Sequence, residues 1–389
     1  MKKRIVIVGG GFVGLRTAQI ISRTCDGFEV LLIDKKCDFL FTPWLVDALA
    51  GEMKLEDITV DLSDLAKQDG FDFLEAEVIR VAREKRTIRL RTAVSEKDLP
   101  FDILVLSQGV RTSYYDIPGA ETYSYPLKNP GDIWRAQQAI LDTLAKATAE
   151  QNKMEHERLL SMAVVGAGPT GIEAIFAVKQ FIERKQADGT VSADLKPRFH
   201  LIQAAPQILP GFPESVVRHA NAELDLHGIQ TMTGEAVIGV EPGLIRTVSG
   251  KAVPASFILW CAGIEPSMVD LTPPPIMERG GYPVVDNFFR IDKNIFCAGD
   301  VSGFKLHGVP VSKTAQTAMQ MAPILAENIL RTLDGKKLVP FRTTTKGVVI
   351  TLGDTGVISL KHKITIKAKW SVPLRNSFYR HRFKQMTKR

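Results

Sequence analysis

The stretch IVIVGGGFVG, from Ile5 to Gly14, decides the fold of this chain. Its apolar start predicts a buried parallel strand, and the pattern Gly9-x-Gly11-x-x-Gly14 turns that strand directly into a helix. The first glycine permits the tight turn, the second leaves room for a pyrophosphate at the backbone, and the third lets the helix pack on the strand. The following strand ends in Asp34, where a ribose hydroxyl needs an acceptor, so the stretch predicts a dinucleotide site at the helix N-terminus.

The same pattern occurs a second time. The apolar run from Ser161 to Val165 is followed by Gly166-x-Gly168-x-x-Gly171 and a second helical segment. Two such turns predict two dinucleotides, one a resident flavin and one a visiting nicotinamide, because a protein that carries both can pass a hydride between them. The expected fold is α/β, with two Rossmann-like dinucleotide-binding domains and a small C-terminal strand and helix extension.

The second unit departs from the first at Gln203, which stands where an acid is expected. An acid would accept a hydrogen bond from the ribose 2′-hydroxyl and repel a 2′-phosphate, which favours NAD over NADP. Glutamine bonds the hydroxyl without that repulsion, but residues 204–208 offer no Arg or Lys for a 2′-phosphate. NADH is therefore the expected cofactor at this site, with NADPH possible.

Three further strand ends are candidates for ligand contact. The apolar runs 102–109 and 258–263 stop at Gly109 and Gly263, where glycine allows a ligand close to the backbone. The run 295–300 ends in Asp300 at a predicted helix start, where the carboxylate could accept bonds from flavin ribityl hydroxyls while the helix N-terminus supports its charge. A simple helix N-cap is the alternative role for Asp300.

An apolar segment, residues 39–51, follows the first strand-helix-strand unit and is interrupted by Pro43. It is expected beyond the carboxyl ends of the strands, the ligand crevice of an open α/β sheet, which makes Thr42 and Pro43 candidates for cofactor contact. The alternative is a packed connection with Trp44 in the core.

The remaining pattern predicts a few elements outside the two glycine turns. A strand is expected over 73–81, a linker over 114–129, and a long helical region from an N-cap at Asp132 to about Leu160. A polar surface loop is expected over 185–197 and a helix over 311–333, with Ala315 and Gln316 near its start.

Composition indicates a globular, intracellular protein. The chain has 389 residues, of which 45% are hydrophobic and 24% charged, enough for two or three domains. Its 4 cysteines form no CxxC pair, so neither a metal site nor a redox disulfide is expected. The apolar run after the basic start ends at Gly9, too short for a signal peptide, and no run reaches the roughly 18 apolar residues of a membrane span.

The net charge of +7 is concentrated in the C-terminal segment. Residues 361–389 hold ten Lys or Arg and no acid, so residues 1–360 carry about −3. Alternation over 360–372 predicts a half-buried strand with a basic face, and after Pro373 residues 374–386 predict a weakly amphipathic helix with aromatic and cationic side chains. This pattern favours attachment to a membrane surface, with a solvated face or an oligomer contact as alternatives.

Seven motifs together resemble the type II NADH dehydrogenases, which are flavin-dependent NADH:quinone oxidoreductases. They are GGGFVGL at Gly9, PWLVDALAG at Pro43, VLSQG at Val105, VVGAGPTGIE at Val164, ILWCAGIEP at Ile258, FCAGD at Phe296 and TAQTAMQ at Thr314. The match runs in consistent order over roughly residues 3–335. The resemblance implies FAD as the resident flavin, NADH as the donor and a quinone as the acceptor in a respiratory chain.

The resemblance also implies roles for single residues. Those expected to contact FAD are Gly9, Gly11, Gly14, Asp34 and Asp300, and those expected to hold NADH are Gly166, Gly168 and Gly171. Glu173 matches the glutamate beside the nicotinamide, and Ala315 and Gln316, with Gln320, match a run near the flavin edge where quinone approaches. The departures are Gln203 and a C-terminal segment shorter and less apolar than is usual.

The expected domains are an FAD-binding domain built from residues 1–115 and 285–335, an inserted NAD(P)H-binding domain at 116–284, and a basic C-terminal region at 336–389. The expected location is the cytoplasm, peripheral on the inner face of the cell membrane, with a homodimer possible. One alternative is a soluble NAD(P)H:acceptor flavin reductase. Another is a flavin-bearing nucleic-acid-binding protein resembling apoptosis-inducing factor, but nucleic-acid binding is not expected because the basic residues are terminal rather than spread over a broad patch.

Overall fold

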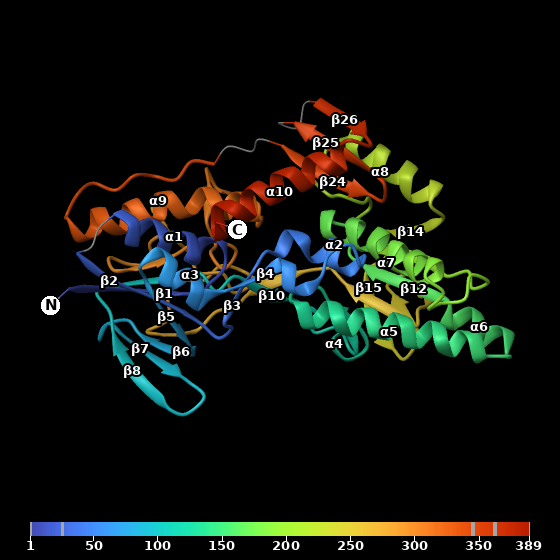
Figure 1. Cartoon of the computed structure of the whole chain (residues 1–389), viewed down its shortest axis with the longest axis horizontal. Helices are drawn as coiled ribbons and strands as arrows, with labels where there is room; N and C mark the ends of the chain where they lie inside the picture. The colour runs from blue at the N-terminus through green and yellow to red at the C-terminus, as the bar shows by residue number, and fades with distance from the viewer. Residues whose placement is uncertain (1, 25–26, 344–346, 361–363, 389) are drawn as a thin grey trace.

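The computed structural model describes residues 2–24, 27–343, 347–360 and 364–388, and it has two α/β halves side by side (Figure 1). The first half is built on a parallel sheet with strand order β21-β9-β1-β2-β5. Its strands are β1 (Lys3–Val8), β2 (Phe28–Asp34), β5 (Asp72–Glu75), β9 (Ile103–Leu106) and β21 (Ile295–Cys297). The last strand comes from a distant part of the chain, so this half is discontinuous in sequence.

Strand β1 shows why this half has two layers of core. Ile5 and Ile7 are fully buried in the cluster that includes the helices, whereas Val6 and Val8 belong to a second cluster on the opposite face. Side chains alternate across a strand, so the four successive apolar residues Ile5 to Val8 must be covered on both sides. Helices α1 (Phe12–Thr24) and α9 (Ala315–Leu333) pack on each other on one face, and the other face is covered by a mixed sheet of order β20-β6-β7-β8, in which only β20 and β6 are parallel. That sheet comprises β6 (Glu77–Ala82), β7 (Thr87–Arg91), β8 (Glu96–Pro100) and β20 (Asp270–Thr272).

The second half repeats the arrangement of the first. Its parallel sheet has the order β11-β18-β12-β13-β14 and consists of β11 (Tyr125–Pro126), β12 (Ser161–Val165), β13 (Arg198–Gln203), β14 (Ile229–Thr233) and β18 (Phe257–Trp260). The central strand again leads through a glycine turn into a helix, α7 (Pro169–Ala187). The further helices are α4 (Ala120–Tyr123), α5 (Pro130–Ala149), α6 (Lys153–Leu159) and α8 (Glu214–Leu226), and a small antiparallel sheet holds β15 (Val237–Glu241), β16 (Leu244–Thr247) and β17 (Ala252–Pro254).

Two adjacent chain crossings join the halves as an antiparallel ribbon. Strand β10 (Val110–Thr112) leaves the first half, and β19 (Ile264–Pro266) returns from the second. The chain therefore passes twice between the halves; the expected domain bounds, with the second domain inserted into the first, stay a prediction. The short elements of the first half are β3 (Asp38–Leu40), the 3-10 turns Thr42–Trp44 and Leu55–Ile58, α2 (Leu45–Leu49), β4 (Thr59–Asp61), α3 (Leu62–Asp69), β22 (Lys305–Leu306) and β23 (Val309–Pro310).

The C-terminal part lies across both halves (Figure 1). Strands β24 (Val348–Leu352), β25 (Thr355–Leu360) and β26 (Ile364–Ala368) form an antiparallel sheet against α7 and α8, and α10 (Ser371–Thr387) extends from it to α1. At the far end of α10, Gln19 Nε2 donates to the Met386 carbonyl at 2.7 Å. Among the described residues, no helix is long and apolar enough to cross a membrane.

Several predicted boundaries were wrong. The expected strand over 73–81 is two strands in different sheets, β5 and β6. Asp132 is not the N-cap of α5: Asn129 is, and the Asp132 side chain closes a capping box with it. The long helix divides into α5 and α6, and α7 extends to Ala187 into the expected loop. No helix begins at Asp300, which lies in a turn, and α9 begins only at Ala315.

Part of the predicted C-terminal strand, residues 361–363, lies outside the described residues. The described part is β26 rather than one long strand, and α10 begins two residues before Pro373. Proline is accepted there because the first turn of a helix needs no donated backbone N–H bond.

Candidate functional site

The first glycine turn is shaped to bring a ligand against the backbone. A Cβ atom on Gly14 would lie 1.9 Å from the carbonyl oxygen of Gly9, and one on Gly9 would lie 2.5 Å from the backbone of Ser107, so neither position accepts a side chain. A Cβ atom on Gly11 would meet nothing within 4 Å. The outer glycines therefore serve close packing, and the middle one leaves open space at the helix N-terminus, which fits a pyrophosphate.

Asp34 is fixed beside this turn. Its Oδ2 atom accepts from the backbone N–H of Gly10 at 2.6 Å, and its Oδ1 atom accepts from the N–H of Lys36 at 2.9 Å. A carboxylate has about four acceptor positions, so both oxygens can still accept a ribose hydroxyl. The position and the remaining acceptor capacity fit the role predicted for Asp34.

The second glycine turn repeats this geometry. A Cβ atom on Gly171 would lie 1.7 Å from the carbonyl oxygen of Gly166, whereas one on Gly168 would meet nothing within 4 Å. Gln203 takes the place of Asp34, because its Oε1 atom accepts from the backbone N–H of Ala167 at 2.8 Å. Since the oxygen is used in this bond, the amide Nε2 is the group that Gln203 can offer to a ligand as a donor.

The turn at Asp300 has two cationic neighbours that sequence reasoning missed. Lys313 Nζ donates to the carbonyl oxygens of Asp300 and Ser302 at 2.6 and 3.0 Å and lies 4.0 Å from the ring centre of Tyr282. Burial raises the pKa of the Asp300 carboxyl, and the charges of Lys313 and Lys128 oppose this rise. Burial likewise lowers the pKa of both lysines while Asp300 opposes it. Because Lys128 comes from the second half, the Asp300 turn lies where the two halves meet.

The start of α9 is held against this turn. Thr314 caps the helix by accepting from the N–H of Thr317 at 3.2 Å, and the N–H of Gly299 donates to Met321 Sδ at 3.3 Å. These contacts place Ala315 and Gln316, the first two residues of α9, near the Asp300 turn. The predicted flavin-edge residues therefore lie in the same region as the predicted FAD-binding acid.

Gly109 and Gly263, the two glycines at strand ends, differ in the space around them. Gly263 lies against Tyr115, since an added Cβ atom would be 2.0 Å from the phenol oxygen. Gly109 has open space around it, and its φ of +73° is what favours glycine. Only Gly109 therefore presents a free backbone face to a ligand.

The segment with Thr42 and Pro43 forms a 3-10 turn under the C-terminal helix. Trp44, the last residue of this turn, is 5% exposed, and its ring centre lies 4.6 Å from that of Phe41 and 5.0 Å from that of Phe383 in α10. The interpretation of Trp44 as a core residue is confirmed. The structure shows no ligand contact for Thr42 or Pro43, so their assignment stays a prediction.

Glu173 contacts the C-terminal sheet. Its Oε1 atom accepts from Thr351 at the backbone N–H, 2.9 Å, and at Oγ1, 2.8 Å, and it lies 3.7 Å from Arg375 Nη1. Arg375 also forms a buried ion pair with Asp47 in α2. Sequence reasoning placed Arg375 in a membrane-facing helix and assigned no role to Asp47, although an acid inside the apolar segment 39–51 was a signal that could have been used.

Two cysteines near the strand ends carry protonated thiols. Burial raises the pKa of Cys261 and of Cys297 to about 12. A thiol with such a pKa is a poor nucleophile at neutral pH, because the thiolate is the reactive form.

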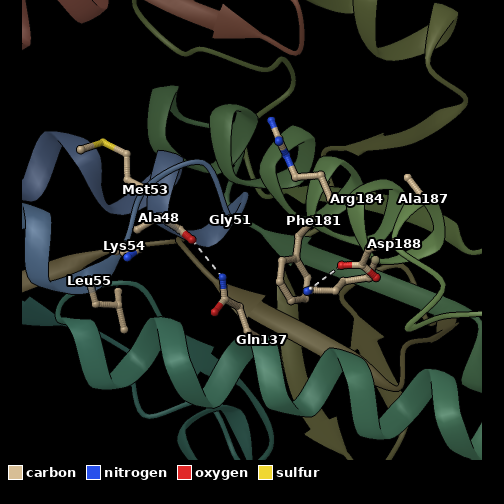
Figure 2. Close-up of a pocket in the computed structure, with 11 residues that line it drawn as sticks. Ala48, Gly51, Met53, Lys54, Leu55, Gln137, Phe181, Arg184, Ala187 and Asp188 are labelled. Carbon is tan, nitrogen blue, oxygen red and sulfur yellow. Dashed lines mark hydrogen bonds and ion pairs between the residues drawn. The ribbon is translucent and has the colours of Figure 1, made fainter.

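A hollow of ≈ 680 Å³ lies between α2, α5 and α7 (Figure 2). Across it, Gln137 Nε2 donates to the carbonyl oxygens of Ala48 and Leu49 at 2.9 and 3.2 Å, which satisfies acceptors at the end of α2. The contact fixes the short helix α2, which carries Asp47, against the second half. The hollow contains none of the predicted cofactor residues.

Known proteins resemble this chain over most of its length. A family model described as pyridine nucleotide-disulphide oxidoreductase matches residues 3–322. A type II NADH:quinone oxidoreductase from Staphylococcus aureus (strain bovine RF122 / ET3-1) is 28% identical over 361 residues, which cover 90% of this chain and 88% of the relative.

Solved structures give the same picture of the fold. The structure of NDH2 from Plasmodium falciparum in complex with NADH has a TM-score of 0.87 at 19% identity, covering 97% of this chain and 94% of that chain. The sulfide:quinone oxidoreductase from Aquifex aeolicus has a TM-score of 0.82 at 19% identity, covering 99% and 92%. At these identities the likeness shows the fold alone.

Proposed function

The chain belongs to the pyridine nucleotide-disulphide oxidoreductase family, and within it we propose that this protein is an FAD-dependent NADH:quinone oxidoreductase. The observation that carries the proposal is the duplicated glycine turn, in which both middle glycines face open space and both following strands end in a side chain bound to the turn. A relative named for this activity, 28% identical over nearly the whole chain, supports the choice of donor and acceptor.

The first turn would hold FAD and the second NADH. Gly11 and the N-terminus of α1 would receive the FAD pyrophosphate, and Asp34 and Asp300 would accept from its ribose and ribityl hydroxyls. Gly168 and the N-terminus of α7 would receive the pyrophosphate of NADH, and Gln203 would donate to its ribose. When bound, FAD accepts a hydride from NADH and passes two electrons to the acceptor.

The protein's own contribution is chiefly positioning. The β10–β19 ribbon joins the two halves, and Lys128 of the second half interacts with Asp300 of the first, which supports the proposal that the two cofactor sites are neighbours. Gln316 is the residue proposed to donate to a quinone carbonyl, and Glu173, fixed by Thr351, is the residue proposed to place the nicotinamide.

We propose that the protein is peripheral on the inner face of the cell membrane and attaches through its C-terminal part. Trp370 and Phe378 are 53% and 58% exposed and lie among the cationic residues Lys369 and Arg380. Aromatic and cationic side chains together suit a lipid headgroup surface.

A soluble NAD(P)H:acceptor reductase remains the second candidate because of how α10 packs. Met386 is fully buried, and the ring of Phe383 lies on Phe41 and Trp44, so most of the apolar side of α10 faces the protein. Co-sedimentation with vesicles containing anionic lipid separates the two candidates. We also propose that the protein forms a homodimer, and light scattering is the measurement that tests this.

The function is tested by anaerobic stopped-flow absorbance. NADH is expected to bleach the oxidised flavin rapidly, and a short-chain quinone is expected to restore its absorbance rapidly. Slow recovery with quinone would transfer the assignment to the soluble reductase, and absence of bleaching would remove the second glycine turn as a nicotinamide site.

A further inference from the structure

A buried ion pair lies where the three parts of the molecule meet. Asp47 comes from α2 in the first half, Arg375 from α10, and their side chains are 6% and 5% exposed. Arg375 Nη1 donates to Thr351 Oγ1 at 3.0 Å, and the same hydroxyl donates to Glu173 of the second half. One guanidinium therefore connects two carboxylates from different halves of the molecule.

The second oxygen of Asp47 lacks a partner. Oδ1 accepts from Arg375, but Oδ2 is buried and has no hydrogen bond within the part of the chain that the structure describes. An unsatisfied buried carboxylate oxygen is costly, and a native protein that retains one calls for an explanation such as a bound water or a functional role.

A cavity of ≈ 240 Å³ lies beside this group. It is lined by Asp47, Glu173, Thr351 and Arg375, and also by the exposed residues Asp354 and Lys369. Its size is ample for several waters, since one water needs roughly 10–15 Å³ of such space. Because exposed residues line it together with Asp47, the cavity extends from beside the buried carboxylate towards the surface.

The environment brings Asp47 into the range where it exchanges protons near neutral pH. Burial raises its pKa to about 6, the negative charges of Glu173 and Glu52 act in the same direction, and Arg375 opposes them. Tyr379, which also packs against this cluster, stays protonated, because burial raises the pKa of its phenol above the physiological range. Asp47 is thus the buried group of this cluster with the capacity to take up a proton from solvent and give it up again.

The proposed reaction needs such a group. In the balanced equation, NADH + H⁺ + quinone gives NAD⁺ + quinol. NADH supplies two electrons and one hydrogen nucleus as hydride, so the second hydrogen of the quinol must come from solvent. Reduction of the flavin by NADH takes a hydride only, whereas reduction of the quinone needs this extra proton.

We propose that Asp47 takes up from the cavity the proton consumed in quinone reduction, and that Arg375 is the positioning residue that holds the carboxylate for this task. Arg375 and Thr351 link Asp47 to Glu173, the residue proposed to place the nicotinamide, which connects the carboxylate to the proposed site. The C-terminal helix then contributes to the chemistry as well as to attachment. This inference rests on the proposed function.

The test measures the two half-reactions separately by stopped flow, between pH 5 and 9, on the full-length holoprotein with a short-chain quinone. The rate constant for reoxidation of the wild-type flavin is expected to fall as pH rises through about 6, because only protonated Asp47 can donate. In Asp47→Asn this dependence disappears and reoxidation at pH 7 slows at least tenfold, in line with the 10²–10⁴-fold effects of general acids. Bleaching by NADH is affected far less than reoxidation.

Arg375→Gln provides a variant that moves the pH dependence without removing the carboxylate. Loss of the cation raises the pKa of Asp47 further, so the fall in the reoxidation rate moves to higher pH, while Arg375→Lys restores it towards the wild-type position. The matched control is Asp354→Asn, an acid exposed at the mouth of the same cavity, which leaves the profile unchanged.

Three results would overturn the inference: a wild-type reoxidation rate independent of pH around 6, a profile of Asp47→Asn equal to wild type, or a profile of Arg375→Gln that does not move. The wild-type profile decides even if both variants fail to fold. Failure of the proposed function is distinct, because the wild-type flavin would then not be bleached by NADH or not be reoxidised by quinone.

Discussion

In the second glycine turn, Gly171→Ala should destabilise the fold, whereas Gly168→Ala should weaken only the binding of NADH. In Gly171→Ala the new methyl group would lie 1.7 Å from the carbonyl oxygen of Gly166, so the backbone must move. Overpacking of this kind costs about 1–3 kcal/mol or more, and it separates helix α7 from strand β12. In Gly168→Ala the methyl group meets no protein atom within 4 Å, so the fold is retained and only the ligand is obstructed.

The size of the second effect follows from the bonds that the methyl group displaces. If NADH must retreat from one backbone N–H at the helix N-terminus, it loses a hydrogen bond to a charged group, worth about 1.5–3 kcal/mol. That corresponds to a roughly 10- to 100-fold rise in the Kd for NADH. The assay is stopped-flow bleaching as a function of NADH concentration, with thermal unfolding as the measure of stability. Gly168→Ala with unchanged NADH affinity, or Gly171→Ala with unchanged stability, would refute the reasoning about the turn.

Four other outcomes are expected. Gln203→Glu should increase the preference for NADH over NADPH about tenfold, as the ratio of kcat/KM values, because a carboxylate repels the 2′-phosphate. The pKa of Asp47 is raised to about 6 in the folded protein, so the folded state binds more protons than the unfolded state. The free energy of unfolding should therefore fall by about 3 kcal/mol as pH rises from about 4 to 6. Thermal unfolding of Asp47→Asn should lack this pH-dependent component. Trp44→Ala should destabilise the protein by about 3–5 kcal/mol, since the side chain is buried between Phe41 and Phe383, and chemical denaturation would measure it. Trp370→Ala with Phe378→Ala should weaken vesicle binding at least fivefold without changing flavin bleaching by NADH, and equal co-sedimentation of variant and wild type would count against membrane attachment.

The parts of the fold that could be predicted from sequence are those specified by local pattern. Each glycine turn needs only a strand, a tight bend and a helix within about 20 residues, and both were predicted with their following strands. The error at Asp300 has a local cause too. A Gly-Asp after a strand resembles a helix start, but here it is a turn followed by the short β22–β23 hairpin before the helix.

The contacts that could not be predicted join residues far apart in the chain. Asp47 and Arg375 are separated by 328 positions, and no periodicity relates them. From the sequence alone, Arg375 is one more cation of a basic C-terminal segment. Its burial depends on the sheet β24–β26, which packs α10 against the place where the two halves meet. The packing of Phe383 and Met386 against the protein was not predicted either. The weak helical pattern of residues 374–386 does not show which surface covers the apolar side of the helix.

The discontinuity of the first half has a consequence for biosynthesis. Strand β21 completes the first sheet only after residue 297 has been made, and α9, which covers α1, follows it. The inserted half, by contrast, has all its sheet strands within residues 125–260, so it can close while the ribosome still holds the rest. During that interval the buried strand β9 lacks its neighbour β21, and helix α1 lacks its cover α9. The nascent chain should therefore depend on chaperones. A stalled chain whose residues up to about 280 have emerged from the ribosome should show a protease-resistant second half beside a protease-sensitive first half.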